Sequence, residues 1–569
     1  MLSTADPFDV HRALGATGLL AEFNDAGVLA AADVHVARRL SELLGEGDDA
    51  VRLACALAVR APRVKHVHVD LATIRGTATT EDEAVVDLSG LSWPGKDWVG
   101  RVAISRLVSD GPLRLEGTAL YLDRYWREER SVASDLLALN EAAPSDEALL
   151  DDGLGRLLDD DQQALAAATA VRRRLAIVAG GPGTGKTTTV ARILALLYEQ
   201  TRGARLHVAL AAPTGKAQSR LQEAVQTEAR GLDVSEAVRE RILELQASTL
   251  HRLLGWRPDS NSRFRHNRAQ KLPHDVVIVD ETSMVSLSQM ARLVEAIRPD
   301  ARLILVGDPG QLASIEAGAV LGDIVGAVNG PLREGIVVLE RVHRFGGAIA
   351  SLADAIRAGD ADTALHILGA GHSDVTWIED AASLREPAVA SARAVHAAAR
   401  AKDADGALDA LRGFRILCAH RRDVADWTTH LETWLGVDAT DRFYAGRPLL
   451  VTANDYELGL FNGDAGVIVA GEERGIAAFE RGERVSPARL SAVDTAYAMT
   501  IHKAQGSQFK TAAVLLPDAD ARILTRELLY TAATRAQEHL ILAGSEAAIR
   551  AAIARPIARA SGLRARLCE

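Results

Sequence analysis

Residues 180–187 constrain the fold of this chain more than any other segment, because they read GGPGTGKT and fit the phosphate-loop pattern G-x-x-x-x-G-K-[ST]. An apolar run of buried-strand type precedes them at 175–179, and apolar residues recur at helical spacing over 190–197. Glycines in such a loop let backbone N–H groups point at phosphates, and the helix N-terminus adds partial positive charge. The segment therefore predicts a site for a nucleoside triphosphate.

The loop also gives roles to single side chains. Lys186 would reach the β- and γ-phosphates, and the hydroxyl of Thr187 would ligate Mg²⁺. The predicted nucleotide contacts of the loop are Gly180, Gly181, Pro182, Gly183, Thr184, Gly185, Lys186, Thr187 and Thr188. The loop alone does not say which class of NTPase the chain belongs to.

Two carboxylates follow a second apolar strand, at 276–279, where a phosphate-loop enzyme needs them. Asp280 is predicted to hold the Mg²⁺ shell, and Glu281 to orient and deprotonate the attacking water. Gln311 follows the end of another strand, where its amide would touch the γ-phosphate or that water. Together with Lys186, Glu281 and Gln311 are predicted catalytic residues.

An arginine supplied by a second domain would distinguish a motor NTPase from a switch NTPase. Such an arginine stabilises the transition state only when the cleft between the two domains closes. Arg344 lies in LERVHRF and Arg535 in YTAATRA. For either arginine alone, a surface salt bridge would be the plainer interpretation. Their order relative to the phosphate loop and the carboxylates favours a catalytic role for both.

The composition is typical of a large globular protein and speaks against a nucleic-acid binder whose whole surface is basic. The chain has 569 residues, which suggests roughly three or four domains, and a formal net charge of −11. Any nucleic-acid site must therefore be a local patch. The sequence contains no run of eighteen or more apolar residues, and its first residues lack the basic head of a signal peptide. We expect a cytoplasmic protein that does not span a membrane.

Apolar runs and composition divide the chain into segments. An acidic stretch at 141–160 is expected to be a linker after a mostly helical N-terminal domain at 1–140. A first α/β domain is expected at 161–346, with strands at 206–212, 276–279 and 303–306. A second is expected at 347–569, with strands at 414–419, 512–516 and 540–543. A Gly- and Val-rich β insert is expected within it at 440–492, with a small barrel as a candidate shape.

Several polar segments are candidates for phosphodiester contacts, because short side chains and helix starts suit a nucleic-acid backbone. These candidate residues are Pro213, Thr214, Lys216, Thr249, His251, Arg252, Thr500, His502, Lys503 and Gln505. The stretch 256–272 is rich in arginine and is expected to form a small basic hairpin beside the nucleic acid, with a solvated loop as the alternative.

In their order and spacing, these segments resemble the superfamily 1 helicases, and within them the RecD family, the alpha subunits of exodeoxyribonuclease V. The resemblance covers about residues 155–545. It implies two RecA-like P-loop NTPase domains with an SH3-like insert, and an N-terminal domain that docks on partners. It also implies that Gln163 reads adenine, that Arg344 belongs to motif IV, and that Asn462, in the RecD-type segment 459–464, contacts DNA.

This resemblance implies a function: an ATP- and Mg²⁺-dependent helicase that moves 5′→3′ on single-stranded DNA within a heterotrimer with RecB- and RecC-like subunits. The nuclease would lie in RecB, because only about thirty residues follow motif VI, which the resemblance places at 530–535. Two alternatives stay open, an RNA-acting helicase and an ATP-dependent clamp or assembly subunit without unwinding. Gly310, Gln508 and Gln537 depart from the family pattern, which puts coupling or DNA affinity in doubt but removes no catalytic group.

Overall fold

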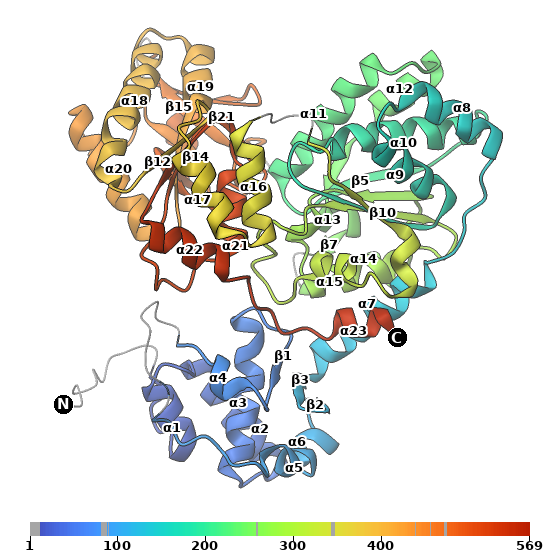
Figure 1. The fold of residues 1–569 in the computed structure, drawn as a ribbon, viewed down its shortest axis with the longest axis vertical. Coiled ribbons are helices and arrows are strands. Elements are labelled where there is room, and N and C mark those ends of the chain that lie inside the picture. Colours follow the sequence, from blue (N-terminus) through green and yellow to red (C-terminus); the bar gives the residue numbers. More distant parts are fainter. Residues whose placement is uncertain are drawn as a thin grey trace.

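Two parallel β-sheets organise the chain (Figure 1). The computed structural model describes residues 12–80, 88, 90–257, 260–342, 347–438, 440–455, 457–471 and 475–569. We call 123–342 the first α/β unit and 347–554 the second, with an N-terminal unit before them and a C-terminal arm, 555–569, after them. The predicted α/β class with two parallel sheets is confirmed.

The first sheet has six strands, all parallel. Their order is β11 (Ile336–Leu339), β4 (Leu175–Gly180), β10 (Arg302–Gly307), β9 (Val276–Val279), β5 (Val208–Ala212) and β6 (Ala247–Thr249). The strands β4 and β9 are buried along their whole length, as expected of a parallel sheet covered on both faces. Because the strands run in one direction, the residues that follow β4, β9 and β10 meet at one edge.

Helices cover both faces of this sheet. One face packs against α8 (Glu147–Leu157), α9 (Asp161–Arg172), α10 (Lys186–Gln200), α11 (Gly215–Gly231) and α12 (Glu236–Glu244). The other packs against α7 (Asp123–Ala138), α13 (Leu250–Leu254), α14 (Leu287–Ala296) and α15 (Val320–Gly326). Side-chain caps fix several helix starts: Asp160 Oδ1 accepts from the backbone N–H groups of Gln162 and Gln163.

The second sheet has five parallel strands, in the order β12 (Val375–Ile378), β21 (Ala536–Ala543), β20 (Phe509–Leu515), β13 (Phe414–Cys418) and β19 (Ala498–Thr500). One face carries α16 (Ala348–Ala358), α17 (Ala361–Gly369), α21 (Arg526–Ala533) and α22 (Glu546–Ala554). Beside the other face lie α18 (Arg385–Arg400), α19 (Ala404–Gly413) and α20 (Arg421–Leu435).

The β insert is an antiparallel sheet in the order β17 (Arg484–Val485), β16 (Ile476–Phe479), β15 (Ala465–Val469), β14 (Pro448–Val451) and β18 (Val493–Thr495). It has its own small core, which includes Leu449, Ile468 and Phe479. Its strands lie almost wholly within the predicted range 440–492; only β18 falls beyond it.

In its described residues, the N-terminal unit combines six helices with a three-stranded antiparallel sheet in the order β1-β3-β2. Its elements are α1 (Gly18–Asp25), α2 (Ala31–Leu44), α3 (Asp49–Arg63), β1 (His68–Asp70), α4 (Ile74–Thr77), α5 (Trp98–Ala103), α6 (Arg106–Ser109), β2 (Leu113–Glu116) and β3 (Ala119–Leu122). A separate hydrophobic core forms among these elements, centred on α3.

Two boundaries differ from the sequence expectation. The helix α7, expected in the N-terminal domain, buries Val132 and Leu136 in the core of the first α/β unit, where it packs along α14. The acidic segment 141–160, expected as a linker, contains the helix α8, whose Leu150 is fully buried against α10. Acidic side chains on the exposed face of a short amphipathic helix gave the segment the composition of a linker.

The C-terminal arm leaves the second α/β unit and crosses the molecule to the first (Figure 1). Arg559 donates to the backbone oxygens of Ser314 and Gly318 at 2.6 and 2.7 Å. The arm ends in α23 (Leu563–Cys568), which packs against α7 and α15. Arg566 pairs with the fully buried carboxylate of Glu129 at 2.9 Å. Ala560 of the arm also donates its backbone N–H to His66 Nδ1 of the N-terminal unit at 2.8 Å. The arm therefore connects all three units, which the predicted division of the chain did not include.

Candidate nucleotide-binding site

The phosphate loop connects β4 to α10 with the geometry that its sequence predicts. Gly183 and Gly185 have φ values of 80° and 81°, which side-chain-bearing residues rarely adopt, and α10 begins directly after Gly185. Lys186 Nζ lies inside the curl and donates to the backbone oxygens of Gly180 and Gly181, at 2.7 Å each. A lysine held at the centre of a glycine loop on a helix N-terminus is suited to bind phosphates.

The carboxylates Asp280 and Glu281 follow β9, beside the phosphate loop. Asp280 is buried, and burial together with the charge of Glu281 raises the pKa of Asp280 to about 6, an effect that Lys186 partly offsets. Glu281 has a φ of 52°, in the left-handed region, which costs roughly 1–3 kcal/mol for a residue with a side chain. Strain of this kind is typical of functional sites, and here it turns the chain sharply after the strand.

Asp308 links the residues that follow β10, and sequence reasoning did not single it out. Its carboxylate accepts from Gln311 Nε2 at 2.9 Å and from the Gly310 backbone N–H at 3.0 Å. Tyr530, from the second α/β unit, donates its hydroxyl to the same carboxylate at 3.2 Å. Burial raises the pKa of Asp308. The predicted residue Gln311 is thus held by a carboxylate that also contacts the other unit.

The second α/β unit approaches this edge of the first sheet through the end of α21. The hydroxyl of Thr531 accepts from the Leu312 backbone N–H at 2.9 Å, and a Cβ atom at Gly181 would lie 2.9 Å from the Tyr530 hydroxyl. Arg535 is buried, with its guanidinium donating to the backbone oxygens of Thr531 and Ser507 at 2.9 and 3.2 Å. Burial lowers its pKa.

The charge of Arg535 interacts with carboxylates of the first unit. Although burial dominates, the carboxylates of Glu281 and Asp308 both raise the pKa of Arg535, so its charge lies within electrostatic range of the first unit. The other predicted arginine, Arg344, lies outside the described residues. The structure thus brings together Lys186, Asp280, Glu281, Gln311 and Arg535, from segments that are far apart in the sequence.

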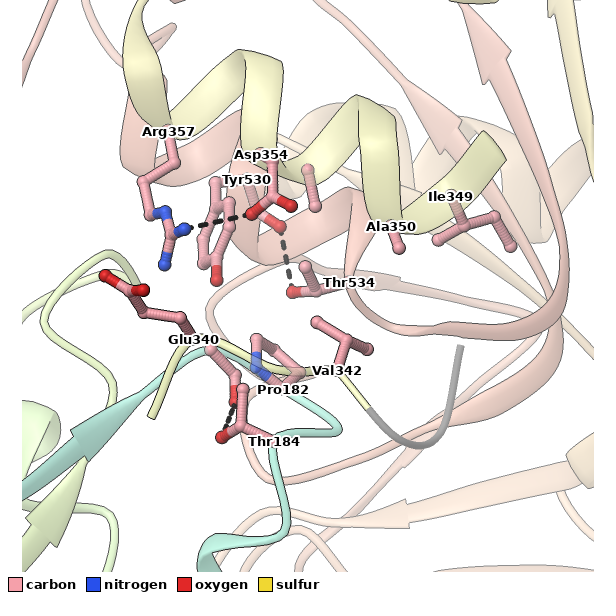
Figure 2. A pocket seen from close by; sticks show the side chains of 12 residues that line it. Pro182, Thr184, Glu340, Val342, Ile349, Ala350, Asp354, Arg357, Tyr530 and Thr534 are labelled. Atoms are coloured by element: carbon pink, nitrogen blue, oxygen red, sulfur yellow. Dashed lines mark hydrogen bonds and ion pairs between the residues drawn. The ribbon is translucent and has the colours of Figure 1, made fainter. Parts of the chain in front are cut away.

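A small pocket separates the phosphate loop from the second unit, as Figure 2 shows. Pro182, Thr184 and Glu340 line its first-unit side. Arg357 and Tyr530 line the opposite side, on α16 and α21. The pocket therefore brings a cation of the second unit opposite the phosphate loop. Arg357 was not a sequence candidate, because nothing in the local pattern around it marks it as functional.

Two predicted nucleotide contacts are engaged elsewhere. Gln163 is buried beside the loop, where its Nε2 donates to the Thr184 backbone oxygen at 3.3 Å and its Oε1 accepts from Arg192 at 2.7 Å. The hydroxyl of Thr188 donates to Glu228 on α11 at 3.1 Å, on the side of α10 away from the pocket. Contact of either residue with the nucleotide stays a prediction.

The predicted nucleic-acid residues lie in two different settings. Thr214 and Thr249 cap helices, with hydroxyls accepting from the backbone N–H groups of Ala217 and Arg252, and Pro213, His251 and Arg252 adjoin these caps. Thr500 likewise accepts from the Lys503 backbone N–H, while Asn462 is exposed in the insert.

Three other candidates contact protein across a unit boundary or within the insert. Lys216 Nζ donates to the Gly463 backbone oxygen of the insert at 3.2 Å, and burial lowers its pKa. Gln505 donates to the Leu312 backbone oxygen at 2.8 Å, and Lys503 pairs with Asp494 at 2.9 Å. Burial lowers the pKa of His502 to about 4, so this side chain is neutral near pH 7. Lys216 and Lys503 therefore contact the insert, and Gln505 contacts the first unit.

The basic stretch 256–272 forms the predicted hairpin, from β7 (Trp256–Arg257) and β8 (Ser260–Phe264). After the hairpin, Arg268 pairs with Asp135 on α7 at 2.6 Å, and Lys271 donates to the Glu295 backbone oxygen at 2.8 Å. These two cations fix the base of the hairpin to the first unit.

Comparison with known families divides the chain as the structure does. Residues 163–317 match an AAA domain, residues 495–543 a UvrD-like helicase C-terminal domain, and residues 25–121 the N-terminal domain of the RecBCD enzyme subunit RecD. The RecBCD enzyme subunit RecD of Mycolicibacterium smegmatis is 50% identical over 558 residues, which are 95% of this chain and 98% of that protein. The chain belongs to the RecD family.

Other relatives agree with RecD membership. The RecBCD enzyme subunit RecD of Mycobacterium tuberculosis is 48% identical, over 98% of both chains. An ATP-dependent RecD2 DNA helicase of Deinococcus radiodurans is 31% identical over 77% of this chain and 56% of that protein. A crystal structure of Bacteroides Pif1 bound to ssDNA covers 68% of this chain and 92% of that chain, with 16% identity and a TM-score of 0.40. Because this identity and TM-score are low, the RecD assignment rests on the relatives that are similar in sequence.

Among the helices of the described ranges, none combines the length and the apolar character needed to cross a bilayer.

Proposed function

We propose that this chain is the RecD subunit of a RecBCD-type enzyme and moves 5′→3′ along single-stranded DNA by hydrolysing ATP. The chain is an ATP-dependent DNA helicase by family, and the proposal adds its direction, its partners and its residues. In this proposal the two α/β units are RecA-like motor domains and the β insert is SH3-like. The observation that carries it is that Lys186, Asp280 and Glu281 of the first unit interact electrostatically with one another, and Glu281 with Arg535 of the second. Tyr530 of the second unit also donates to Asp308 of the first.

Each side chain has a separate task in hydrolysis. Lys186 binds the β- and γ-phosphates, and Glu281 orients the attacking water and accepts its proton. Arg535 lies in the second unit within electrostatic range of the carboxylates of Glu281 and Asp308, and it stabilises the charge that develops on the transferring phosphoryl group. Asp308 positions Gln311 through a hydrogen bond of 2.9 Å, and Tyr530 ties that pair to the second unit. Binding and loss of ATP therefore change the relation of the two units.

The residues fit a divalent cation. Asp280 is a buried carboxylate whose pKa rises to about 6, so a cation beside it would stabilise its charged form. Thr187, directly after Lys186 on the first turn of α10, would supply a hydroxyl ligand. When bound, Mg²⁺ neutralises charge on the phosphates of ATP.

DNA in this proposal crosses the edge where the first unit, the second unit and the insert meet. The helix caps at Thr214 and Thr249, with Arg252, would contact the phosphodiester backbone of one strand. Contacts of this kind carry little sequence information and weaken as salt rises. The N-terminal unit, with a core of its own, would dock on RecB- and RecC-like subunits. The complex would work on broken DNA ends in the cytoplasm of a bacterial cell.

The experiment is ATP hydrolysis by the full chain, alone and mixed with its RecB- and RecC-like partners. Each mixture is assayed without nucleic acid, with single-stranded DNA and with RNA of matched sequence, and Lys186→Gln serves as the blank. We expect strong stimulation by DNA, little by RNA, and loss of hydrolysis in the blank. Duplexes with a 5′ or a 3′ single-stranded tail then test direction, and only the 5′-tailed substrate should be unwound by this motor.

The other outcomes separate the alternatives. Equal stimulation by RNA would favour an RNA-acting helicase of the same superfamily. Absence of stimulation in every mixture would favour an ATP-dependent clamp or assembly subunit. Unwinding of the 3′-tailed duplex with a RecB variant that lacks its own motor activity would contradict the proposed direction.

A further inference from the structure

Arg357 lies on α16 of the second unit and lines the pocket opposite the phosphate loop (Figure 2). It is neither in the phosphate loop nor in the segments of Arg344 and Arg535 that carry the family resemblance. Across the pocket are Pro182 and Thr184 of the loop and Glu340, the residue after β11. A guanidinium at this place faces the position where a bound triphosphate would lie.

Arg357 forms only a weak ion pair, with Asp354. Its Nη2 donates to Asp354 Oδ1 at 3.0 Å, one helical turn earlier, and the two side chains are 41% and 56% exposed. An ion pair this exposed is screened by water and contributes little. The aliphatic part of the side chain is better fixed, because a Cβ atom at Gly310 would lie 3.7 Å from Arg357 Cδ. The stem is thus placed against the Gly310 loop while the guanidinium is free to change partner.

Arg535 differs in each of these respects. It is buried, and it donates to Thr531, Ser507 and Thr534 within its own unit, at 2.9, 3.2 and 3.3 Å. Rearrangement of Arg535 requires that these buried hydrogen bonds break, as suits a group that stays in place and acts in the transition state. Arg357 needs only to leave an exposed carboxylate, as suits a group that binds the nucleotide in the ground state.

We propose that Arg357 is a nucleotide-binding residue, which exchanges Asp354 for the phosphate chain of ATP and so draws α16 of the second unit toward the phosphate loop. The inference rests on the proposed function and names a residue that the function does not require. A guanidinium suits this role because it stays charged at all working pH values and can donate two parallel hydrogen bonds to a phosphate. Asp354 then acts as a competitor that holds Arg357 when ATP is absent.

Two substitutions should act in opposite directions. Arg357→Ala removes the contact, so we expect the Kd for ATP and the KM to rise about tenfold or more, while kcat changes less than about threefold. Asp354→Asn removes the competitor, so we expect the Kd to fall about two- to threefold. Arg357→Lys keeps the charge without the paired donors and should restore part of the affinity. A purely structural role would make Arg357→Ala and Asp354→Asn fail together.

The test measures the Kd of the full chain for a fluorescent ATP analogue without DNA, and the KM and kcat for ATP with saturating single-stranded DNA. Arg550→Ala is the matched control, because Arg550 is 46% exposed on α22 of the same unit and pairs with Asp362, away from the pocket. Thermal unfolding of every variant checks folding. An unchanged Kd in a folded Arg357→Ala protein would overturn the inference, and so would an equal rise in Kd for Asp354→Asn.

Failure of this inference and failure of the proposed function are distinguishable. A chain that binds ATP through Arg357 without any stimulation by DNA would support the inference and contradict the helicase. A chain stimulated by DNA, with hydrolysis lost in Lys186→Gln but normal affinity in Arg357→Ala, would do the reverse.

Discussion

In each α/β unit a strand of the parallel sheet leads through a short turn into a helix. Only the turn of the first unit has a backbone conformation suited to bind phosphates. In the first unit, β4 leads into α10 through 181–185, with two glycines at φ values near 80°. In the second, β13 leads into α20 through Ala419 and His420, both described and neither with a positive φ. The fold is repeated, whereas the backbone conformation that turns N–H groups toward an anion is not.

This difference divides the work between the units. The first unit supplies the phosphate loop and the carboxylates Asp280 and Glu281 at the ends of its strands. The second supplies side chains that face these groups from outside, Tyr530 and Arg535 near the end of α21 and Arg357 on α16. We therefore expect changes in the first unit to remove nucleotide binding or the chemical step itself. Changes in the second unit should alter ATP affinity or turnover without removing the phosphate loop or the carboxylates.

The largest effect is expected from Glu281→Gln in the first unit. Loss of the proton acceptor should lower kcat about 10³-fold, with the Kd for ATP within a few-fold of wild type, because glutamine keeps the size and shape of the side chain. Single-turnover hydrolysis and equilibrium binding of an ATP analogue measure the two quantities. A variant that retains more than a tenth of the normal kcat would assign the proton acceptor to another residue.

A smaller effect, on affinity, is expected from Gly185→Ala. The φ of 81° disfavours any side chain, and a Cβ atom there would clash with Gln163 Nε2. The loop must therefore deform, and we expect the Kd for ATP to rise roughly 10²-fold through lost backbone hydrogen bonds. Gly436→Ala is the matched control, since Gly436 has a φ of 65° at the end of α20 with no atom near its Cβ position. Equal losses in both variants would show a general effect of strain, not a phosphate cradle.

The smallest of these effects concerns the stability cost of a buried carboxylate. Because the pKa of Asp280 is raised to about 6, its contribution to stability is complete at low pH and is lost as the pH rises through 6. At pH 8 in a chelator, Asp280→Asn should therefore raise the free energy of unfolding by roughly 1–3 kcal/mol while abolishing hydrolysis. The gain should shrink toward pH 5.

Thermal unfolding across this pH range measures that prediction. Asp300→Asn is the control, since the Asp300 side chain is 72% exposed. If Asp280→Asn and wild type unfolded at the same temperature at pH 8, the buried carboxylate would carry no such cost.

Local pattern was enough to predict the elements that carry the chemistry. The strands at 276–279 and 303–306, the phosphate loop and the β insert all lie where the sequence indicates, because apolar runs and glycine spacing are local signals. Asp308 and Arg357 gave no such signal. Their roles depend on the approach of α16 and α21 to the first unit, across more than two hundred residues in the case of Asp308 and Tyr530.

The C-terminal arm illustrates the same limit. Its sequence, rich in alanine and arginine, gives no sign that Leu563 and Leu567 enter the core of the first unit. Similarly, Gln505 has the polar character of a surface residue, but its amide is buried against Leu312. Pairings between distant segments decide these placements, and hydrophobic periodicity does not encode them.

The central claim is that the second unit completes a site built by the first, and Arg535→Ala tests it most directly. Equilibrium binding of an ATP analogue and DNA-stimulated turnover are measured on the same preparation, with Lys186→Gln as the comparison. The account predicts near-normal affinity with turnover lowered about 10³-fold or more for Arg535→Ala, and loss of hydrolysis for Lys186→Gln. Near-normal turnover in a folded Arg535→Ala protein would contradict it.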